Sequence, residues 1–306
     1  MSDDVGVSIS PRAASNGRGA LDGLYAAIHR IRPVRRALDL LRRVAPGLPG
    51  QCTRLSYEAF CTLDKRREIL FMNYGYAAPG PDGHLVDLGD DDAVNRFSIQ
   101  LYHRVAGAVD LAGKDVLEVG SGRGGGASYV ARCLGPRSVT GVDFAHKAVQ
   151  FCTDQYKSEG LSFRRGDACH LPFDAGTFDA VLNVESSCHY PSMDAFLGEV
   201  SRVLRPGGHL LFADLRHPDH VPELREQFNR SGLVVVQEER ITPNVLHALD
   251  LDSRRRLEAL QRQVPRLIFP LVKDFAGIKG SPVYESFASG ECEYLRFVLQ
   301  KTPRPT

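Results

Sequence analysis

The chain has 306 residues, of which 38 are Lys or Arg and 37 are Asp or Glu, so its formal net charge is +1. This balance gives no electrostatic reason for a nucleic-acid partner, and we expect none. The seven cysteines include no Cys-x-x-Cys pair, which is typical of reduced cytoplasmic thiols and argues against a disulfide framework or a zinc site.

The first third of the chain has a different composition from the rest. Residues 1–19 are rich in Ser, Gly and Asp and are predicted to be disordered. Residues 20–47 have apolar residues at helical spacing and many arginines, so we expect a helix. Its basic face either packs on the core or contacts a membrane surface or a lipid-like substrate. We therefore predict a helical extension and lid over 20–96, followed by the main domain over 97–306.

No apolar run approaches the roughly 18 residues that a membrane span requires, so we expect no stable membrane insertion. The acidic, polar start MSDDVGVSIS is unlike a signal peptide, and we expect a cytoplasmic protein.

From residue 97 onward, predicted strands and helices alternate. The predicted strands are Asp115–Val119, Ser138–Asp143, Leu161–Arg165, Phe178–Val184, His209–Ala213 and Leu233–Glu238. The predicted helices are Gly126–Leu134, Ala145–Tyr156, Met193–Val203, Leu224–Asn229 and residues 243–264. This alternation predicts an α/β fold with a mostly parallel sheet and helices on both faces. The tail from Asp274 to Gln300 is predicted to add a hairpin.

A glycine turn is the main functional motif. The strand Val116–Val119 runs into Gly120-Ser-Gly122-Arg-Gly-Gly125 and then into a helix. Glycines there permit a tight turn and let a ligand approach bare backbone. Asp143 ends the next strand, at the position of a carboxylate that binds ribose hydroxyls. The spacing also satisfies the dinucleotide fingerprint, so the turn alone does not separate the two kinds of cofactor.

Three further features favour S-adenosylmethionine over a dinucleotide. Glu118 stands two residues before the first glycine, Gly166-Asp167-Ala168 follows the third strand, and Leu204-Arg-Pro-Gly-Gly208 precedes the fifth. In order and spacing these resemble the core of the class I S-adenosylmethionine-dependent methyltransferases. The resemblance implies a Rossmann-like fold with a mostly parallel seven-stranded sheet flanked by helices.

A closer resemblance covers roughly residues 70–300. The segments FMNYGY, LYHRVAGAVDL, GSGRGGGASYVAR, LNVESSCHYP, VLRPGG and ADLR are similar to those of the mycobacterial phthiotriolone and phenolphthiotriolone dimycocerosate O-methyltransferases. The tail segments DFAGIKG and YESFASGECEYLRF are similar too. Sugar and polyketide methyltransferases of natural-product pathways share much of this pattern.

The resemblance implies a cofactor site residue by residue. The backbone of Gly120 and Gly122 is expected to meet the methionine portion, and Asp143 the ribose hydroxyls. Phe144 is expected to flank the adenine, with Asp167 accepting from its amino group and Ala168 beside it.

A second group of residues is expected around the methionine end. Asn73, Tyr74 and Tyr76 are predicted to form a lid there, with core packing as the alternative for the two tyrosines. Gln100 is predicted to touch the methionine carboxylate. Glu185 is expected either to be structural or to orient the methionine amine.

Proton transfer is predicted after the fourth strand. An alcohol that attacks a methyl group is assisted by a base that takes its proton. His189, in the segment Asn183–Tyr190, is the expected base because imidazole titrates near neutrality. Related sugar methyltransferases have a histidine at the matching position, whereas the dimycocerosate enzymes place theirs where this chain has Cys188. Asp214, which ends the fifth strand, either orients His189 or is itself the base.

Each of these two residues also has a purely structural interpretation. His189 can be a loop histidine bound to backbone, and Asp214 a helix N-cap. Lys279 and Tyr284 are candidates for lining the acceptor pocket. No carboxylates cluster beyond the strand ends, so we expect no metal.

The sequence thus predicts an S-adenosylmethionine-dependent O-methyltransferase that acts on a hydroxyl of a small hydrophobic metabolite, such as a polyketide, a glycolipid or a sugar-bearing natural product. Three alternatives stay open: a C-methyltransferase, a non-methylating cyclase or binding protein on the same fold, and a nicotinamide-dependent oxidoreductase. The oligomeric state is open as well.

Overall fold

The computed structural model describes residues 69–263, 269 and 276–302. Its strands are β1 (Asp115–Val119), β2 (Ser138–Asp143), β3 (Leu161–Arg165), β4 (Phe178–Val184), β5 (Leu204–Arg216), β6 (Leu233–Arg240) and β7 (Glu293–Lys301). Its helices are α4 (Asp90–Ala93), α5 (Arg96–Ala106), α6 (Gly125–Cys133), α7 (His146–Gln155), α8 (Met193–Val203), α9 (Val221–Arg230), α10 (Thr242–Gln263) and α12 (Pro282–Ala288). Two short 3-10 turns are η1 (Ser187–His189) and η2 (Pro218–His220).

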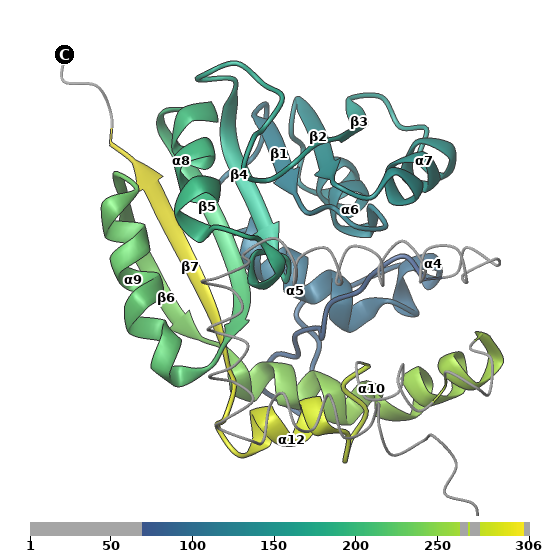
Figure 1. The fold of residues 1–306 in the computed structure, drawn as a ribbon. Coiled ribbons are helices and arrows are strands. Elements are labelled where there is room, and N and C mark those ends of the chain that lie inside the picture. Colours follow the sequence, from purple (N-terminus) through teal and green to yellow (C-terminus); the bar gives the residue numbers. More distant parts are fainter. Residues whose placement is uncertain (1–68, 264–268, 270–275, 303–306) are drawn as a thin grey trace, which may run out of the picture. The chain divides into compact units, whose positions relative to one another are not determined.

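The seven strands form one sheet in the order β3-β2-β1-β4-β5-β7-β6 (Figure 1). Strands β1 to β5 pair in parallel, and β7 runs antiparallel to both β5 and β6. The predicted mostly parallel, seven-stranded α/β fold is confirmed. The strand order reverses between β1 and β4, and ligands of such sheets bind beyond the carboxyl ends of the strands at this switch point.

Helices cover both faces of the sheet, and the alternation of side chains along β1 shows how. Leu117 and Val119 belong to a core cluster that includes Phe196 and Leu197 of α8 and Phe228 of α9. These two helices lie together along one face (Figure 1). Helix α8 begins where the Ser192 hydroxyl accepts a hydrogen bond from the Ala195 amide at 3.1 Å, and its buried residues recur every three or four positions.

The opposite face of β1 packs against α5. Val116 and Glu118 alternate with the residues above, and Glu118 bonds to Tyr102 of α5. Helix α5 buries Ile99, Leu101 and Val105 almost completely. Strand β1 is therefore covered by α8 and α9 on one face and by α5 on the other.

Several predicted elements differ from the structure, and helix α9, for example, begins at Val221 rather than Leu224. Strand β5 is assigned from Leu204 rather than from His209. Its pairing with β4 is nevertheless irregular at the predicted turn, because Leu204 pairs with Phe178 and His209 with Ala180, so Arg205–Gly208 shift the register. The tail is not a hairpin of its own. It folds as helix α12 followed by β7, which inserts between β5 and β6.

The predictions for residues 1–19 and 20–47 fall outside the described residues, and the predicted domain boundaries stay predictions. Within the described part of 20–96, α4 is followed by α5 from Arg96. None of the described helices is both long and apolar enough to cross a membrane.

Candidate active site

The glycine turn after β1 is held by close contacts that exclude side chains. Gly120 has a φ of +77°, and a Cβ there would lie 2.3 Å from the Ser186 hydroxyl oxygen. Gly122 has a φ of +54°, and its amide donates to Asp143 Oδ2 at 2.9 Å. Both positions favour glycine because other residues rarely adopt this backbone conformation. The turn is thus fixed between the end of β2 and the loop after β4.

A buried polar cluster lies against this turn. Asn183 Nδ2 donates to the Val119 carbonyl at 2.9 Å, to Ser186 Oγ at 2.8 Å and to the Tyr190 hydroxyl at 2.9 Å. The hydroxyls of Ser186 and Tyr190 lie 2.6 Å apart. Burial raises the pKa of Tyr190, so its hydroxyl stays protonated. The cluster fixes the loop after β4 to the end of β1.

Two buried polar atoms here have no hydrogen bond among the described residues. They are Ser121 Oγ, inside the glycine turn, and Oδ1 of Asn183, whose amide nitrogen bonds to the Val119 carbonyl just before the turn. Buried polar atoms are nearly always paired, so a ligand or water is expected to satisfy them. Ser121 offers a donor and an acceptor, and Asn183 Oδ1 an acceptor. This chemistry fits a polar cofactor on the turn.

The residues predicted for ribose and adenine lie at the ends of neighbouring strands. Asp143 of β2 pairs with Arg165 of β3, which brings the loop containing Asp167 close to it. Asp143 Oδ1 accepts from the Ala145 amide and Asp167 Oδ1 from the Cys169 amide, each at 2.9 Å. Both carboxylates are therefore oriented by their own loops.

The two predicted adenine neighbours differ in their surroundings. Phe144 is half-buried, and the Arg165 guanidinium stacks 5.5 Å from its ring centre. Ala168 is half-buried and packs against the core cluster. The structure brings both to the same edge of the sheet as Asp143 and Asp167.

Glu118 lies on the α5 face of β1 and is buried, with 1% of its surface exposed. Its Oε1 accepts a hydrogen bond of 2.7 Å from the Tyr102 hydroxyl. Burial raises its pKa to about 8, although the Tyr102 hydroxyl and the Ala127 amide favour the charged form. The other oxygen, Oε2, has no hydrogen bond of good geometry among the described residues. Glu118 thus supports the turn from the α5 side.

Gln100 of α5 is occupied by the chain itself. Its Nε2 donates to the carbonyls of Tyr76 and Gly83, each at 2.8 Å, and its Oε1 accepts from the Leu85 amide at 2.6 Å. Through these three hydrogen bonds, Gln100 holds the loop from Tyr76 to Leu85 in place. The predicted contact with the methionine carboxylate stays a prediction, and it requires one of these bonds to break.

Tyr74 and Glu185 are brought together although 111 residues separate them. Glu185 Oε1 accepts 2.7 Å from the Tyr74 amide and 2.8 Å from the Tyr294 hydroxyl. Burial raises the pKa of Glu185 to about 8, while these two bonds favour the charged form. Glu185 has a φ of +48°, which no other described residue except glycines shares in sign.

Asp214 anchors the η1 turn. It is fully buried, and its Oδ2 accepts from Ser187 Oγ at 2.6 Å and from the Cys188 amide at 3.0 Å. Its Oδ1 accepts from the Leu215 amide at 2.8 Å, and Arg216 forms an ion pair at 3.2 Å. These groups surround the carboxylate and connect it, through Ser187 and Cys188, to the turn that carries His189. That Asp214 either orients His189 or is itself the base stays a prediction.

His189 is the last residue of η1 and is exposed. Its amide donates to the Ser186 carbonyl at 3.1 Å, which places it in the loop fixed by Asn183 and Asp214.

Lys279 and Tyr284, the candidates for the acceptor pocket, meet on Asp250 of α10. The Lys279 ammonium and the Tyr284 hydroxyl donate to Asp250 Oδ1 at 2.8 Å and 2.9 Å. This exposed trio joins α10 to the region of α12, which lies beside it (Figure 1).

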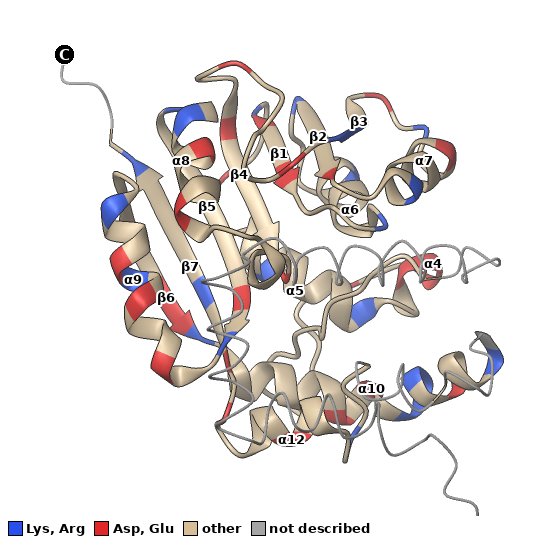
Figure 2. Cartoon of the chain, viewed as in Figure 1, with Lys and Arg blue, Asp and Glu red and all other residues tan. Residues whose placement is uncertain are grey.

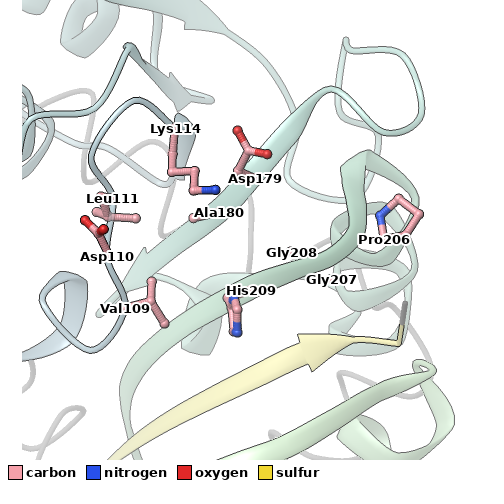
Figure 3. A pocket seen from close by; sticks show the side chains of 10 residues that line it. All are labelled: Val109, Asp110, Leu111, Lys114, Asp179, Ala180, Pro206, Gly207, Gly208 and His209. Carbon is pink, nitrogen blue, oxygen red and sulfur yellow. The ribbon is translucent and has the colours of Figure 1, made fainter. Parts of the chain in front are cut away.

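A cavity lies at the amino-terminal edge of the parallel strands. Lys114, Asp179, His209 and Gly207 are among the residues that line it (Figure 3). These residues lie just before β1 or in the first part of β4 and β5, so the cavity is at the opposite end of the strands from the glycine turn.

Comparison with known proteins now identifies the family. The model of a methyltransferase domain matches residues 117–212, which run from β1 through most of β5. A fatty-acid O-methyltransferase of Mycolicibacterium smegmatis is 39% identical over 253 residues, covering 82% of this chain and 90% of that protein. The chain belongs to the S-adenosylmethionine-dependent methyltransferases.

Other relatives of this methyltransferase agree with that assignment. A phthiotriol/phenolphthiotriol dimycocerosates methyltransferase of Mycobacterium leprae is 39% identical, covering 76% of this chain and 86% of that protein. Among solved structures, the [4+2]-cyclase SpnF has a TM-score of 0.65 at 19% identity and covers 82% of this chain and 95% of its own. A geranyl diphosphate methyltransferase in complex with SAM has a TM-score of 0.54 at 19% identity, covering 76% and 100%. The class I fold and the cofactor S-adenosylmethionine are thereby confirmed.

The sequence did not indicate several residues that build this methyltransferase's site. Tyr294 lies 109 residues from Glu185, so no local spacing predicts their contact. Asn183 and Tyr190 do stand in the segment that contains His189, and their polarity at the end of a buried strand was an available indication.

Proposed function

We propose that this methyltransferase transfers a methyl group to an oxygen of a small, hydrophobic, lipid-like or polyketide-like acceptor. The observation that carries the proposal is the 39% identity with a fatty-acid O-methyltransferase over 82% of the chain. The similarity to a phthiotriol dimycocerosates methyltransferase, whose name also indicates a lipid substrate, supports the same class. The chain has a formal net charge of +1, and both acidic and basic residues lie on α9 and on α10 (Figure 2), so its charge gives no reason for a nucleic-acid partner. We further propose that the protein acts in the cytoplasm.

S-adenosylmethionine, when bound, supplies a methyl group that is already activated, so the protein's main tasks are alignment and exclusion of water. We assign the glycine turn and Asp143 to the methionine and ribose portions, and Phe144, Asp167 and Ala168 to the adenine. The orphaned Ser121 and Asn183 oxygens support a polar ligand on the turn. Tyr74 and Glu185 belong to the methionine side.

For an alcohol acceptor, we assign His189 as the base that takes the hydroxyl proton on an imidazole nitrogen. Asp214 then acts as a positioning residue, because its carboxylate holds Ser187 and Cys188, the two residues before His189. A base on a well-fixed turn keeps its distance to the acceptor constant, which favours proton transfer.

A second acceptor class, the carboxylate of a fatty acid, is favoured by the name of the Mycolicibacterium relative. A carboxylate is ionised at neutral pH and carries no proton to remove. On such an acceptor His189 is dispensable, whereas on an alcohol it is not. The two classes therefore make opposite predictions for a His189 variant.

The test is a methylation screen with S-adenosylmethionine and matched pairs of long-chain fatty acids and long-chain alcohols, followed by mass detection of methylated product. Methyl ester or methyl ether formation supports O-methylation and identifies the acceptor class. Methyl gain on carbon, or no gain on any lipid or polyketide acceptor, contradicts the proposal.

A further inference from the structure

The segment Asn73–Tyr74, here called the strap, crosses the carboxyl end of β4. Its backbone is held by ionisable side chains from two separate parts of the chain. On one side the Tyr74 amide donates to Glu185 Oε1 at 2.7 Å. On the other, Arg256 Nη2 donates to the Tyr74 carbonyl at 3.0 Å and to the Asn73 carbonyl at 3.2 Å. Both polar groups of the Tyr74 backbone are therefore fixed by ionisable side chains.

Arg256 is itself immobilised. It lies on α10, its side chain is 12% exposed, and its Nε donates to Asp252 Oδ2 at 2.8 Å. Asp252 is buried, and Arg256 Nη1 reaches the Ala276 carbonyl at 3.2 Å. All three guanidinium nitrogens are used, and a planar fork of this kind cannot be reproduced by lysine.

Glu185 is an equally constrained partner. Its φ of +48° is a left-handed conformation that non-glycine residues rarely adopt. The Glu185 amide donates to the Ala213 carbonyl at 2.8 Å, and Tyr294 of β7 donates to its carboxylate. Strained residues of this kind persist where surrounding contacts over-determine them, and they gather at functional sites.

An independent observation indicates that the strap meets a ligand. The Asn73 side chain is 6% exposed, and its Nδ2 donates to the Ser98 carbonyl. Its Oδ1 is buried and has no hydrogen bond among the described residues. An unsatisfied acceptor next to Tyr74, which bonds to Glu185 just after β4, is explained by a donor group of the bound cofactor or acceptor.

We propose that Arg256, held by Asp252, is a positioning residue for methyl transfer: it fixes the strap against Glu185 and so shapes the methionine side of the cofactor site. This rests on the proposed placement of the methionine portion at the ends of β1 and β4. Arg256 acts through the strap and is not itself a catalytic residue.

The matched pair of variants is Arg256→Lys and Arg255→Lys. Both arginines pair with Asp252 on the same helix, but only Arg256 donates to the strap. Affinity for S-adenosylmethionine is measured by calorimetry, and amide exchange of the Tyr74 peptide is measured without cofactor. Steady-state kinetics then give KM and kcat separately.

Arg256→Lys is expected to weaken S-adenosylmethionine binding and raise its KM about tenfold or more, the loss typical of a hydrogen bond to a charged group. Exchange at Tyr74 should accelerate, and Arg255→Lys should leave both quantities within about twofold. Equal effects of the two variants, or unchanged affinity and exchange in Arg256→Lys, overturn the proposal.

If Arg256→Lys does not fold, Asp252→Asn provides the same readouts, since it keeps the side-chain volume while removing the charge that holds Arg256. Unchanged affinity and exchange in that variant also overturn the proposal. Because binding and exchange need no acceptor, a wild-type protein that binds S-adenosylmethionine but methylates no lipid contradicts the proposed function alone.

Discussion

The carboxylate of Asp214 accepts a hydrogen bond of 2.6 Å from the hydroxyl of Ser187, two residues before His189. A second bond of 3.0 Å from the Cys188 amide makes Asp214 the anchor of the turn on which the imidazole stands. Asp214 and His189 therefore differ in their exposure to solvent: Asp214 is fully buried, and His189 is exposed. Their substitutions should have different consequences.

Replacing His189 by Ala should lower kcat for an alcohol acceptor by roughly 10²–10⁴-fold, because a positioned base contributes about that much. The melting temperature should change little, since the side chain is exposed. Turnover with matched alcohol and fatty-acid acceptors provides the measurement. A loss of less than about tenfold on the alcohol would mean that proximity and orientation supply most of the rate enhancement.

Replacing Asp214 by Asn should lower both stability and turnover. An amide cannot accept from Ser187, Cys188 and Leu215 at once, so a buried donor loses its partner, at a cost of about 1–3 kcal/mol. The charge of Arg216 is left without its partner too. Thermal melts and kinetics of the same preparation test this.

The control for Asp214→Asn is Asp219→Asn, in the η2 turn that follows β5. The Asp219 side chain is 71% exposed, so its loss should change stability by no more than about 0.5 kcal/mol. If Asp214→Asn melts at the same temperature as this control, Asp214 does not anchor the turn.

The sequence predicted the local features of this fold well. Strands β1 to β4 have the predicted bounds, because each is a short segment rich in apolar or β-branched residues between turn or polar residues. The predicted residues of the glycine turn and the ends of β2 and β3 meet at one edge, since parallel strands bring their carboxyl ends together.

Contacts between distant segments were not predictable in this way. Arg256 binds the carbonyl of Tyr74 across 182 residues, and no periodicity encodes that distance. The tail was misassigned because β7 is defined by its neighbours β5 and β6, not by a turn within the tail. Asp214 was predicted either to orient His189 or to be the base, and only the atomic arrangement shows that its carboxylate holds Ser187 and Cys188.

Replacing Gly120 by Ala should abolish tight binding of S-adenosylmethionine and destabilise the protein. The new Cβ would lie 2.3 Å from Ser186 Oγ and 2.9 Å from the Tyr190 hydroxyl, so the polar cluster must shift. Gly176→Ala is the matched control, because Gly176 has a φ of +66° but no atom within 4 Å of the new Cβ.

The control variant measures the backbone cost alone, which is about 1–2 kcal/mol for a non-glycine residue in this region. Denaturant titration and calorimetry of both variants separate strain from steric conflict. Equal stability of the two proteins, with cofactor affinity unchanged in Gly120→Ala, would show that the turn tolerates a side chain.

Replacing Glu118 by Gln should remove a pH-dependent loss of stability. In the folded protein burial raises the pKa of Glu118 from 4.5 to about 8. Between these two values the folded state retains a proton that the unfolded chain has released, so this group makes stability fall as pH rises. Its favourable contribution is fully present below pH 4.5 and is lost as pH rises toward 8.

Glutamine carries no titratable proton and still offers an oxygen to the Tyr102 hydroxyl. In denaturant titrations without cofactor, the unfolding free energy of the variant relative to that of the wild type should therefore increase steadily from pH 5 to pH 8.

Glu199→Gln is the control, since hydrogen bonding to Arg202 lowers the pKa of Glu199. Its contribution is lost only as pH falls below the ordinary range of a glutamate, so its difference from wild type should stay constant over the same interval. A constant difference for Glu118→Gln as well would show that the carboxyl group ionises normally under the glycine turn.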